Sequence, residues 1–347
     1  MSQSPKTAEA ILTRAWMQRG PLACLLWPLS LLFALLIRLR RAAFALGLKQ
    51  STRLPVPVIV VGNVFIGGTG KTPFAIWLIE ALRAAGYTPG LISRGYGGRQ
   101  SSAADGSEVR EVDAGSKARE VGDEPLLIAL RTACPVVVGR RRVAAAQHLL
   151  AAHPQVDVIV SDDGLQHYAL GRDIEIVLSD ARGAGNGWLL PAGPLREPAT
   201  RRRDFSVVNL PAGAAPPSGA FAMILHGETA QQLADPSQQM RLAAIAGKGR
   251  IAAVAGIGNP ARFFTTLRQA GLSFAEVALP DHHDYSDNPF AALTQQVILI
   301  TEKDAVKCKA IEAIKNDPRI WVVPVTARID GVLAEHIVEK LRERPTA

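Results

Sequence analysis

A glycine-rich stretch, Gly67–Thr72 with the sequence GGTGKT, constrains the fold more than any other part of the chain. It follows the apolar run 58–61 and precedes an apolar segment at 73–79, which gives the order of strand, glycine loop and helix that a phosphate-binding loop requires. Glycines let backbone N–H groups turn toward phosphate oxygens, and the unpaired N–H groups at a helix start attract an anion. The sequence therefore predicts a site for nucleotide phosphates at this junction.

The chemistry of this loop rests on its last two residues. Lys71 is expected to reach the β- and γ-phosphates of a nucleotide, and the hydroxyl of Thr72 is expected to contact Mg²⁺. The usual spacing has a glycine where this chain has Phe65, so an ordinary glycine-rich turn between a strand and a helix is the alternative interpretation. The residues predicted to surround ATP are Phe65, Ile66, Gly67, Gly68, Thr69, Gly70, Lys71 and Thr72.

Composition narrows the class of protein and of partner. The 347 residues are enough for two domains, and 48% hydrophobic with 20% charged residues indicates a globular protein and not a disordered one. The net charge of +8 favours an anionic partner, which could be a nucleotide, a nucleic acid or an anionic lipid. Cys24, Cys134 and Cys308 are scattered, which argues against a disulfide framework or a zinc site and favours a reducing cytosol.

An apolar stretch near the N-terminus, Leu22–Ile37, ends at Arg38, Arg40 and Arg41. As a helix it would reach about 24 Å, less than the roughly 30 Å of a hydrocarbon core, although arginines can snorkel to extend it. A short spanning anchor, an interfacial helix and a buried helix of a soluble protein are all compatible with this pattern. Residues 43–45 imitate a signal-peptide cleavage site, but the domain that follows needs ATP, which is a cytosolic resource.

Strands alternate with helices from about residue 55 to residue 210. We expect strands at 56–61, 88–93, 135–138, 156–160 and 173–178. This alternation predicts an α/β fold of the P-loop nucleotide-binding type, in which helices cover both faces of a mostly parallel sheet. Ligands of such sheets bind at the carboxyl ends of the strands, where the polar motifs of this chain fall.

The composition changes again after the first α/β segment. A connector rich in proline, glycine and alanine at 211–220 precedes short strand-like pieces and a second, smaller α/β unit. We therefore expect a membrane-associated helix with a basic flank at 1–50, a P-loop domain at 51–210, a linker at 211–250, and a C-terminal α/β domain at 251–347.

Carboxylates stand at two positions suited to catalysis or metal binding. Asp162 and Asp163 end an apolar strand, as a Walker B carboxylate does, so one of them is expected to hold Mg²⁺; an ordinary turn is the alternative. Asp123 and Glu124 open an apolar helix after 98–120, a stretch without periodicity that predicts a long mobile loop. A helix N-cap or a general base for an attacking hydroxyl would explain an acidic residue at that point.

Two further polar segments are less specific. His282 and His283 lie in a loop where a solvated surface histidine is the ordinary interpretation, and their neighbours lack metal-ligand spacing. The arginines 201–203 closely follow the turn Leu190–Glu197. They are either a solvated run or a contact for phosphate or lipid headgroups.

Taken together, these segments give the chain a resemblance to a known family. The blocks are 61–63, 67–73, 93–98, 122–125, 162–167, 187–197, 255–258 and 301–307. In this order they resemble the tetraacyldisaccharide 4′-kinases, the lipid A 4′-kinases of Gram-negative bacteria, from the apolar N-terminal helix to about residue 325. The resemblance implies a transferase with two α/β domains facing across a cleft.

The resemblance also implies a reaction and its location. Such an enzyme uses Mg-ATP to phosphorylate the 4′-hydroxyl of a tetraacylated glucosamine disaccharide 1-phosphate in lipid A biosynthesis. It works at the cytoplasmic face of the bacterial inner membrane, so its partners are the lipid substrate and the anionic membrane surface. We infer no nucleic-acid partner and no obligate protein partner.

Family roles transfer to matching positions. Asp123 matches the proposed catalytic base, His282 matches its partner, and Lys71 matches the phosphate-binding lysine. Positions that match residues around the metal and the phosphates are Thr72, Glu124, Asp162, Asp163 and Glu197. Arg94 and Arg196 are candidates for contact with substrate or phosphate.

A rival interpretation is a membrane-recruited ATPase switch with a related glycine loop. Such switches typically carry an extra lysine just before the two glycines, and this chain has Ile66 there. Nucleotide-dependent dimerisation would favour the switch, whereas transfer of label from ATP to a lipid would favour the kinase.

Overall fold

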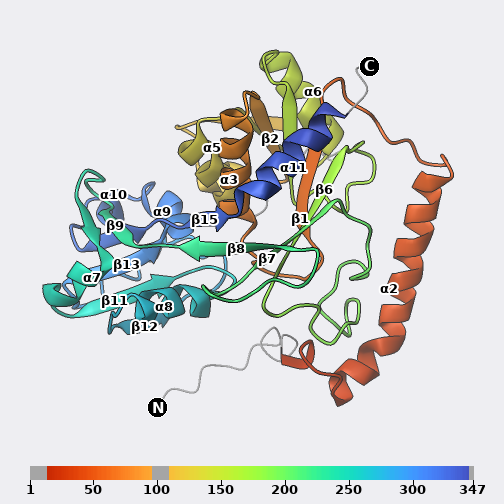
Figure 1. Ribbon diagram of the computed structural model, residues 1–347. Coiled ribbons are helices and arrows are strands. Elements are labelled where there is room, and N and C mark those ends of the chain that lie inside the picture. The colour runs from red at the N-terminus through yellow and green to blue at the C-terminus, as the bar shows by residue number, and fades with distance from the viewer. Residues whose placement is uncertain (1–13, 96–108, 344–347) are drawn as a thin grey trace. The chain divides into compact units, whose positions relative to one another are not determined.

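The computed structural model describes residues 14–95 and 109–343 (Figure 1). The chain divides into two compact units, each built from segments that are distant in the sequence. The first unit consists of Met1–Lys71, Ser161–Met223 and Asp330–Ala347, and the second consists of Thr72–Val160 and Ile224–Ile329. These units do not test the domain boundaries that we expect at residues 50, 210 and 250, so those boundaries stay a prediction.

The N-terminal apolar stretch forms α2, Pro21–Ala45, which is longer than the apolar run that predicts it. Pro21 occupies the first turn, where its missing N–H is not needed. The 25 residues correspond to about 37 Å, so the expected shortfall against a hydrocarbon core is wrong for the whole helix. Among the described residues, α2 is the one helix whose length and composition would allow it to cross a membrane.

The larger sheet has the strand order β15-β8-β7-β6-β1-β5-β2-β4-β3. Neighbours β6 and β1 pair in parallel, as do β7 and β6, whereas β3 runs antiparallel to β4. Every residue of β1 is buried, as expected for a strand of a parallel sheet covered on both faces. The strands are β1 (Val58–Asn63), β2 (Pro89–Ser93), β3 (Val109–Val112), β4 (Val136–Gly139), β5 (Val158–Asp162), β6 (Ile174–Asp180), β7 (Phe205–Asn209), β8 (Phe221–His226) and β15 (Thr326–Ile329).

Helix α3, Lys71–Ala84, follows β1 through the glycine loop. Its buried residues Phe74, Leu78 and Leu82 recur every four positions, so they form one apolar stripe along the helix. Pro73 lies in the first turn, where a proline is tolerated. The other helices of this part of the chain and the C-terminal helix are α4 (Ala118–Val121), α5 (Asp123–Thr132), α6 (Arg142–Ala152) and α11 (Gly331–Arg342).

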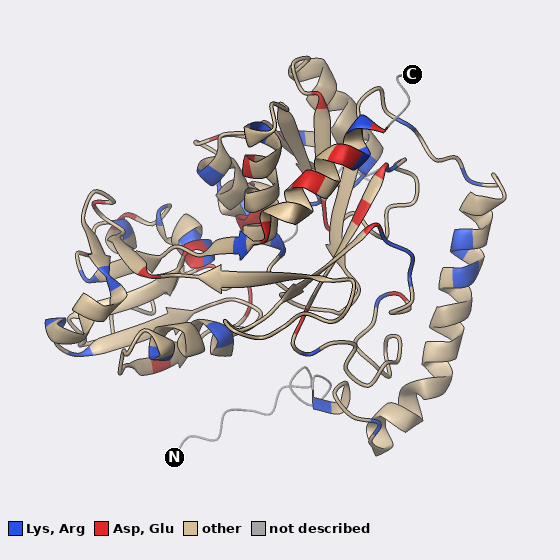
Figure 2. Cartoon of the chain, in the orientation of Figure 1, with Lys and Arg blue, Asp and Glu red and all other residues tan. Residues whose placement is uncertain are grey.

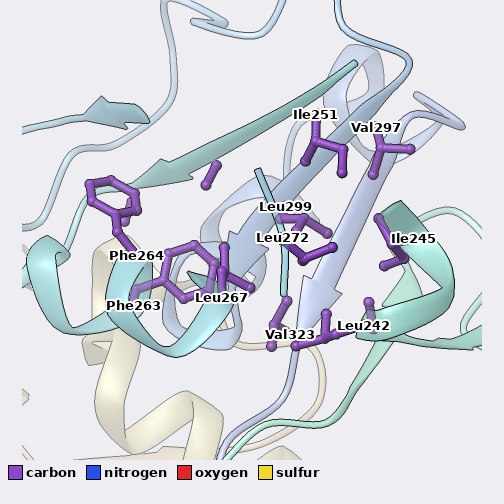
Figure 3. Close-up of a cluster of buried hydrophobic side chains, with 13 residues drawn as sticks. Leu242, Ile245, Ile251, Phe263, Phe264, Leu267, Leu272, Val297, Leu299 and Val323 are labelled. Carbon is purple, nitrogen blue, oxygen red and sulfur yellow. The ribbon is translucent and has the colours of Figure 1, made fainter. Parts of the chain in front are cut away.

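The smaller sheet has the order β10-β9-β14-β13-β11-β12. Its strands are β9 (Thr229–Gln232), β10 (Gln239–Arg241), β11 (Ile251–Ala255), β12 (Ala275–Ala278), β13 (Val297–Thr301) and β14 (Ile320–Val323). Helices α7 (Leu242–Ile245), η1 (Ala246–Lys248), α8 (Pro260–Gln269), α9 (Glu302–Cys308) and α10 (Glu312–Lys315) belong to the same region. Figure 3 shows side chains such as Phe263 and Leu267 of α8 packed with Leu299 of β13 in one buried cluster.

The predicted α/β fold with mostly parallel sheets is confirmed. The loop expected over 98–120 is wrong in part, because β3 and α4 lie within it. Strand β3 is held by antiparallel hydrogen bonds to β4, and such pairing cannot be predicted from the local periodicity of the sequence. Residues 96–108 of that stretch lie outside the described residues.

Candidate active site

The glycine loop joins β1 to α3 with a backbone that only glycine adopts readily. Gly67 and Gly70 have φ angles of 101° and 94°, which L-residues other than glycine rarely reach. A Cβ at Gly70 would lie 2.6 Å from Asn209 Nδ2 and 2.9 Å from Met223 Cε, whereas at Gly68 it would meet open space. A side chain at position 70 would therefore clash with its neighbours, whereas one at position 68 would extend into open space.

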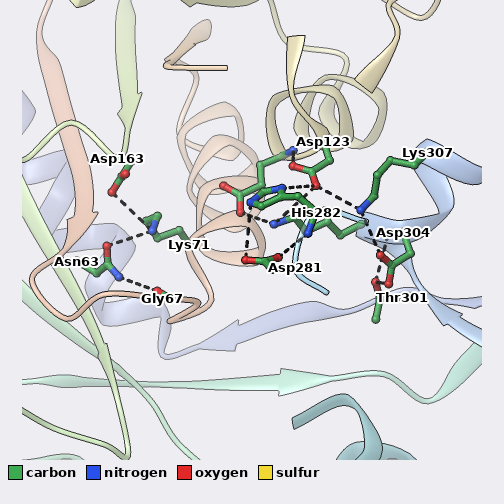
Figure 4. Close-up of polar contacts among 12 residues, drawn as sticks. Asn63, Gly67, Lys71, Asp123, Asp163, Asp281, His282, Thr301, Asp304 and Lys307 are labelled. Atoms are coloured by element: carbon green, nitrogen blue, oxygen red, sulfur yellow. Dashed lines mark hydrogen bonds and ion pairs between the residues drawn. The ribbon is translucent and has the colours of Figure 1, made fainter. Parts of the chain in front are cut away.

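Lys71 and Asn63 are held together at the two ends of this loop (Figure 4). Lys71 Nζ donates to Asn63 Oδ1 at 3.1 Å and lies 3.6 Å from Asp163 Oδ1. Asn63 Nδ2 donates to the carbonyl oxygens of Phe65 at 2.5 Å and Gly67 at 2.9 Å. The amide thus fixes the loop backbone and the lysine at once. The Lys71 ammonium group also lies near the Asp163 carboxylate, and a bound anion could take over the ion pair that this carboxylate makes with Lys71.

Phe65, Ile66 and Thr69 are the remaining loop residues whose contacts bear on a ligand. Phe65 is buried with the Arg182 guanidinium 4.3 Å from its ring centroid, and Arg182 also donates to Gly68 O at 3.3 Å. The Ile66 N–H donates to Pro194 O at 2.9 Å. Thr69 Oγ is buried and has no hydrogen-bond partner among the residues that the structure describes. A cationic loop with an unpartnered hydroxyl fits the phosphates of ATP.

The two carboxylates that end β5 differ in exposure. Asp162 is 2% exposed, whereas the side chain of Asp163 is 33% exposed and lies 3.2 Å from Arg196 Nη1. Asp163 also has φ of 48°, the left-handed region that recurs at functional sites. Both Lys71 and Arg196 therefore approach the same carboxylate, which brings three of the predicted site residues together.

Glu197 lies in a buried polar network rather than at the surface. It is 1% exposed, pairs with Arg201 and accepts a hydrogen bond from Gln166 Nε2 at 3.1 Å. Arg201 also lies 2.5 Å from Glu175 Oε1 and donates to Tyr168 Oη at 3.2 Å. The solvated-run and headgroup interpretations are wrong for Arg201, because two carboxylates hold it in the interior.

Asp123 and His282 meet although 159 positions separate them (Figure 4). His282 Nδ1 lies 3.1 Å from Asp123 Oδ2, and Asp123 Oδ1 accepts the N–H of Glu124 at 3.0 Å. Asp123 is the first residue of α5 and is 3% exposed, with Gly122 at the cap position. His282 has a φ of 59° in the 280–285 loop, so the backbone is bent at the residue that reaches the carboxylate.

The charges around this pair favour a carboxylate next to a cationic imidazole. Burial raises the pKa of Asp123, but the hydrogen bond from His282 and the charge of Lys303 outweigh it and hold the pKa below its usual range. The same hydrogen bond raises the pKa of His282 against the opposing effect of burial. Lys303 and Lys307 place their ammonium nitrogens 3.8 and 3.7 Å from Asp123 Oδ2.

A pocket of about 290 Å³ opens beside the pair. Asp123 and His282 form part of its wall, together with Lys117, Ala118, Arg119, Asp284, Ser286, Lys307, Ala310 and Ile311. Glu124 faces another partner, because Lys303 Nζ donates to its Oε1 at 2.9 Å. The pocket offers both hydrogen-bond donors and acceptors, which suits a polyhydroxylated ligand.

The site residues predicted from the sequence fall into two groups, each inside one compact unit. Lys71, Asp163 and Arg196 form contacts in the first unit, and Asp123 contacts His282 in the second. Arg94 is exposed just after β2, and Thr72 is half-buried in the first turn of α3.

A metal would not be held by protein side chains alone. Among the described ranges, 14–95 and 109–343, no three His, Cys, Asp or Glu residues form a metal-binding group. Mg²⁺ bound with a nucleotide takes most of its ligands from phosphates and water, so it needs only one or two carboxylates from the protein. Asp163, partly exposed beside the loop lysine, fits that requirement.

Four residues that shape these groups are not predicted as site residues from the sequence. Asn63 and Arg182 hold the glycine loop, and Lys303 and Lys307 surround Asp123. For Asn63 a signal existed, because an amide at the end of a fully buried strand needs a partner.

Comparison with known proteins points to one family. The family described as Tetraacyldisaccharide-1-P 4′-kinase matches residues 22–342. A protein of Janthinobacterium sp. (strain Marseille), named Tetraacyldisaccharide 4′-kinase, is 60% identical over 353 residues and both chains are covered completely. A protein of the same name from Herminiimonas arsenicoxydans is 59% identical over 349 residues, covering 97% of this chain and 96% of that protein.

A solved structure is also similar along nearly the whole chain. It is the crystal structure of LpxK from Aquifex aeolicus in complex with ATP, with 28% sequence identity and a TM-score of 0.74. The match covers 92% of this chain and 99% of that chain. The similarity therefore includes both α/β regions and not only the glycine loop.

Proposed function

Because the chain belongs to the tetraacyldisaccharide 4′-kinase family, we infer that it phosphorylates a tetraacyldisaccharide 1-phosphate in the biosynthesis of lipid A. The protein is a kinase, and the family membership removes the ATPase switch as a rival. In the finer proposal, the γ-phosphate of ATP passes to the 4′-hydroxyl of the lipid. The observation that carries it is the Asp123–His282 contact on the wall of a pocket.

The proposed base is Asp123. A sugar hydroxyl is a poor nucleophile, and a positioned carboxylate that accepts its proton contributes roughly 10²–10⁴-fold to the rate. The lowered pKa of Asp123 keeps its carboxylate ionised, and His282 holds Oδ2 in place through a hydrogen bond. The two residues thus form a pair whose geometry supports hydroxyl activation.

The proposed ATP site is the glycine loop. Lys71 neutralises negative charge on the transferring phosphoryl group, and the loop N–H groups with Thr69 Oγ hydrogen-bond to phosphate oxygens. When bound, Mg²⁺ would supply further neutralisation of phosphate charge; Asp163 would hold it, with Thr72 and Asp162 as the other candidates, whereas Glu124 and Glu197 are held by Lys303 and Arg201. Arg196 keeps Asp163 beside Lys71.

Transfer of label is the direct test of this function. Purified protein, γ-labelled ATP, Mg²⁺ and tetraacyldisaccharide 1-phosphate in detergent micelles are expected to yield a labelled lipid. The same lipid with its 4′-hydroxyl already phosphorylated is the matched control and should stay unlabelled. Hydrolysis of ATP without any labelled lipid would overturn the kinase assignment.

We also infer that α2 lies in the membrane interface instead of crossing it. Figure 2 shows α2 tan over most of its length, with its basic residues, in blue, toward the C-terminal end. Ser30 is 4% exposed, donates to Leu189 O at 2.8 Å and accepts the N–H of Ala192 at 2.9 Å. Farther along α2, Phe44 packs on Tyr168 with ring centroids 5.8 Å apart.

These contacts support the interfacial placement. The helix contacts the protein at Ser30, in its first half, and at Phe44, near its C-terminal end, so a spanning α2 would carry backbone carbonyls and Tyr168 into hydrocarbon. An interfacial helix keeps them at the headgroups and turns its exposed leucines toward the acyl chains. The exposed leucines of α2 are Leu22, Leu25, Leu29, Leu31, Leu32, Leu35, Leu36 and Leu39.

Charging this leucine face is expected to release the protein from membranes. The double variant Leu29→Glu with Leu36→Glu removes two buried leucines from the bilayer and should weaken vesicle binding by roughly 10²-fold. Cosedimentation with phosphatidylethanolamine–phosphatidylglycerol vesicles measures this. Val332→Glu, at an exposed apolar residue of α11, is the control and should bind normally. Unchanged cosedimentation of the double variant would place the anchor elsewhere.

Cys24 offers a native probe of the placement. It is exposed near the start of α2, whereas Cys134 and Cys308 are buried. A thiol reagent that cannot cross the inner membrane should label Cys24 in lysed cells but not in intact spheroplasts. Labelling in intact spheroplasts would show that α2 crosses the bilayer.

A further inference from the structure

Two lysines of α9 face the first turn of α5, where the Asp–His pair begins. Lys303 and Lys307 are four positions apart and so lie on one face of the helix. Lys303 donates to Glu124 at 2.9 Å and also lies 3.8 Å from Asp123 Oδ2, whereas Lys307 lies 3.7 Å from the same oxygen, so both lysines act on Asp123. Helix α9 is itself fixed at its start, because Thr301 Oγ accepts the N–H of Asp304 at 3.2 Å.

Lys307 has an unusual environment for an ammonium group. Its side chain is 10% exposed, and Nζ lies 3.7 Å from Asp123 Oδ2 and 3.4 Å from Asp304 Oδ1. Within the described part of the chain, this nitrogen has no hydrogen-bond acceptor. The Tyr285 ring centroid lies 5.3 Å from it, which adds a cation–π contact. Burying an ammonium group that has ion pairs but no hydrogen bond costs free energy of folding, so we expect Lys307 to have a function that offsets this cost.

Asp304 anchors this lysine from the interior. It is 0% exposed and accepts hydrogen bonds from Thr301 Oγ at 2.6 Å and from Gly256 N at 3.2 Å. Lys307 in turn reaches the pocket wall that Asp123 and His282 also line. The result is a chain of charges that runs from a fixed buried carboxylate to the candidate base (Figure 4).

We propose that Lys307 is a positioning residue for Asp123, held by Asp304 so that it keeps Asp123 Oδ2 at the pocket wall beside His282. The inference rests on the proposed kinase function. Lys307 itself does not accept the proton; it fixes the oxygen that does. Loss of its charge should let the carboxylate rotate, which misplaces the base without removing either substrate site.

The test compares three substitutions in the full-length protein, with label transfer to the lipid as the assay. Lys307→Met keeps the side-chain length without charge and should lower kcat by about 10²-fold, with the KM values for ATP and lipid nearly unchanged. Lys307→Arg keeps the charge and should recover most of the loss. Lys309→Met, at an exposed lysine at the end of the same helix, should behave as the wild type.

A fourth comparison separates positioning from general stability. In an Asp123→Asn background, Lys307→Met should cause little further loss, because the group through which it acts is gone. An equal loss in both backgrounds, a change confined to KM, or an arginine variant as slow as the methionine variant would overturn the inference. If Lys307→Met does not fold, Asp304→Asn replaces it, since it removes the anchor and should lower kcat only where Asp123 is intact.

The proposed function and this inference fail in different ways. A wild-type protein that labels no lipid overturns the kinase function and the inference with it. A wild-type protein that labels lipid while Lys307→Met keeps full kcat overturns the inference alone.

Discussion

Lys71→Ala is expected to reduce phosphoryl transfer by about 10³-fold, because a fixed positive charge disappears at the point where charge shifts in the transition state. Lys71 is 12% exposed and is held by Asn63 at 3.1 Å, so the ammonium group is preorganised before the nucleotide arrives. Its loss leaves Asp163 paired with Arg196, and the loop itself should therefore stay folded.

Initial rates of label transfer at saturating ATP and lipid measure this effect. Lys49→Ala, at an exposed lysine shortly after α2, is the control for loss of one positive charge and should keep the wild-type rate. Equal melting temperatures of the two variants would show that the loss is chemical. A Lys71→Ala variant with more than half of the wild-type rate would mean that the loop does not bind the transferred phosphate.

Local patterns predicted the strands and the glycine loop well. The run at 58–61 is buried in full, and a fully apolar strand between turn signals can be recognised without tertiary information. The position of the glycine loop followed from the same logic, and Gly70 occupies a conformation and a contact that only glycine permits.

Elements without a periodic pattern could not be placed from the sequence. Strand β3 is half-exposed and gains its hydrogen bonds from β4, and α4 has a single turn. The extent of α2 was underestimated because its last two turns carry arginines, which are good helix formers although they end the apolar run.

The partners of the site residues were the least predictable part. Arg201 looked like one of three solvated arginines, but Glu197 and Glu175 bury it, and sequence spacing does not reveal such pairing. The contact between Asp123 and His282 joins the start of α5 to the 280–285 loop, two segments that local rules treat separately. Family resemblance suggested the pair, whereas only the fold shows that its members touch.

The largest consequence of that contact is that Asp123 and His282 should act as one unit. Asp123→Asn keeps the shape of the side chain but removes the acceptor charge, and His282→Ala removes its hydrogen-bond donor. Each is expected to lower kcat by roughly 10²–10⁴-fold with little change in the KM for ATP. The double variant should be scarcely slower than the poorer single variant, since neither residue works without the other.

A surface pair of the same chemistry provides the control. His148 Nε2 lies 3.0 Å from Glu111 Oε1, with both side chains nearly half-exposed, so His148→Ala and Glu111→Gln should leave kcat unchanged. Multiplying losses in the Asp123–His282 double variant would show that the two residues act independently despite their 3.1 Å contact. Full kcat in Asp123→Asn would reduce Asp123 to a structural residue of α5 and move the search for the base to Asp163, the more exposed of the two carboxylates that end β5.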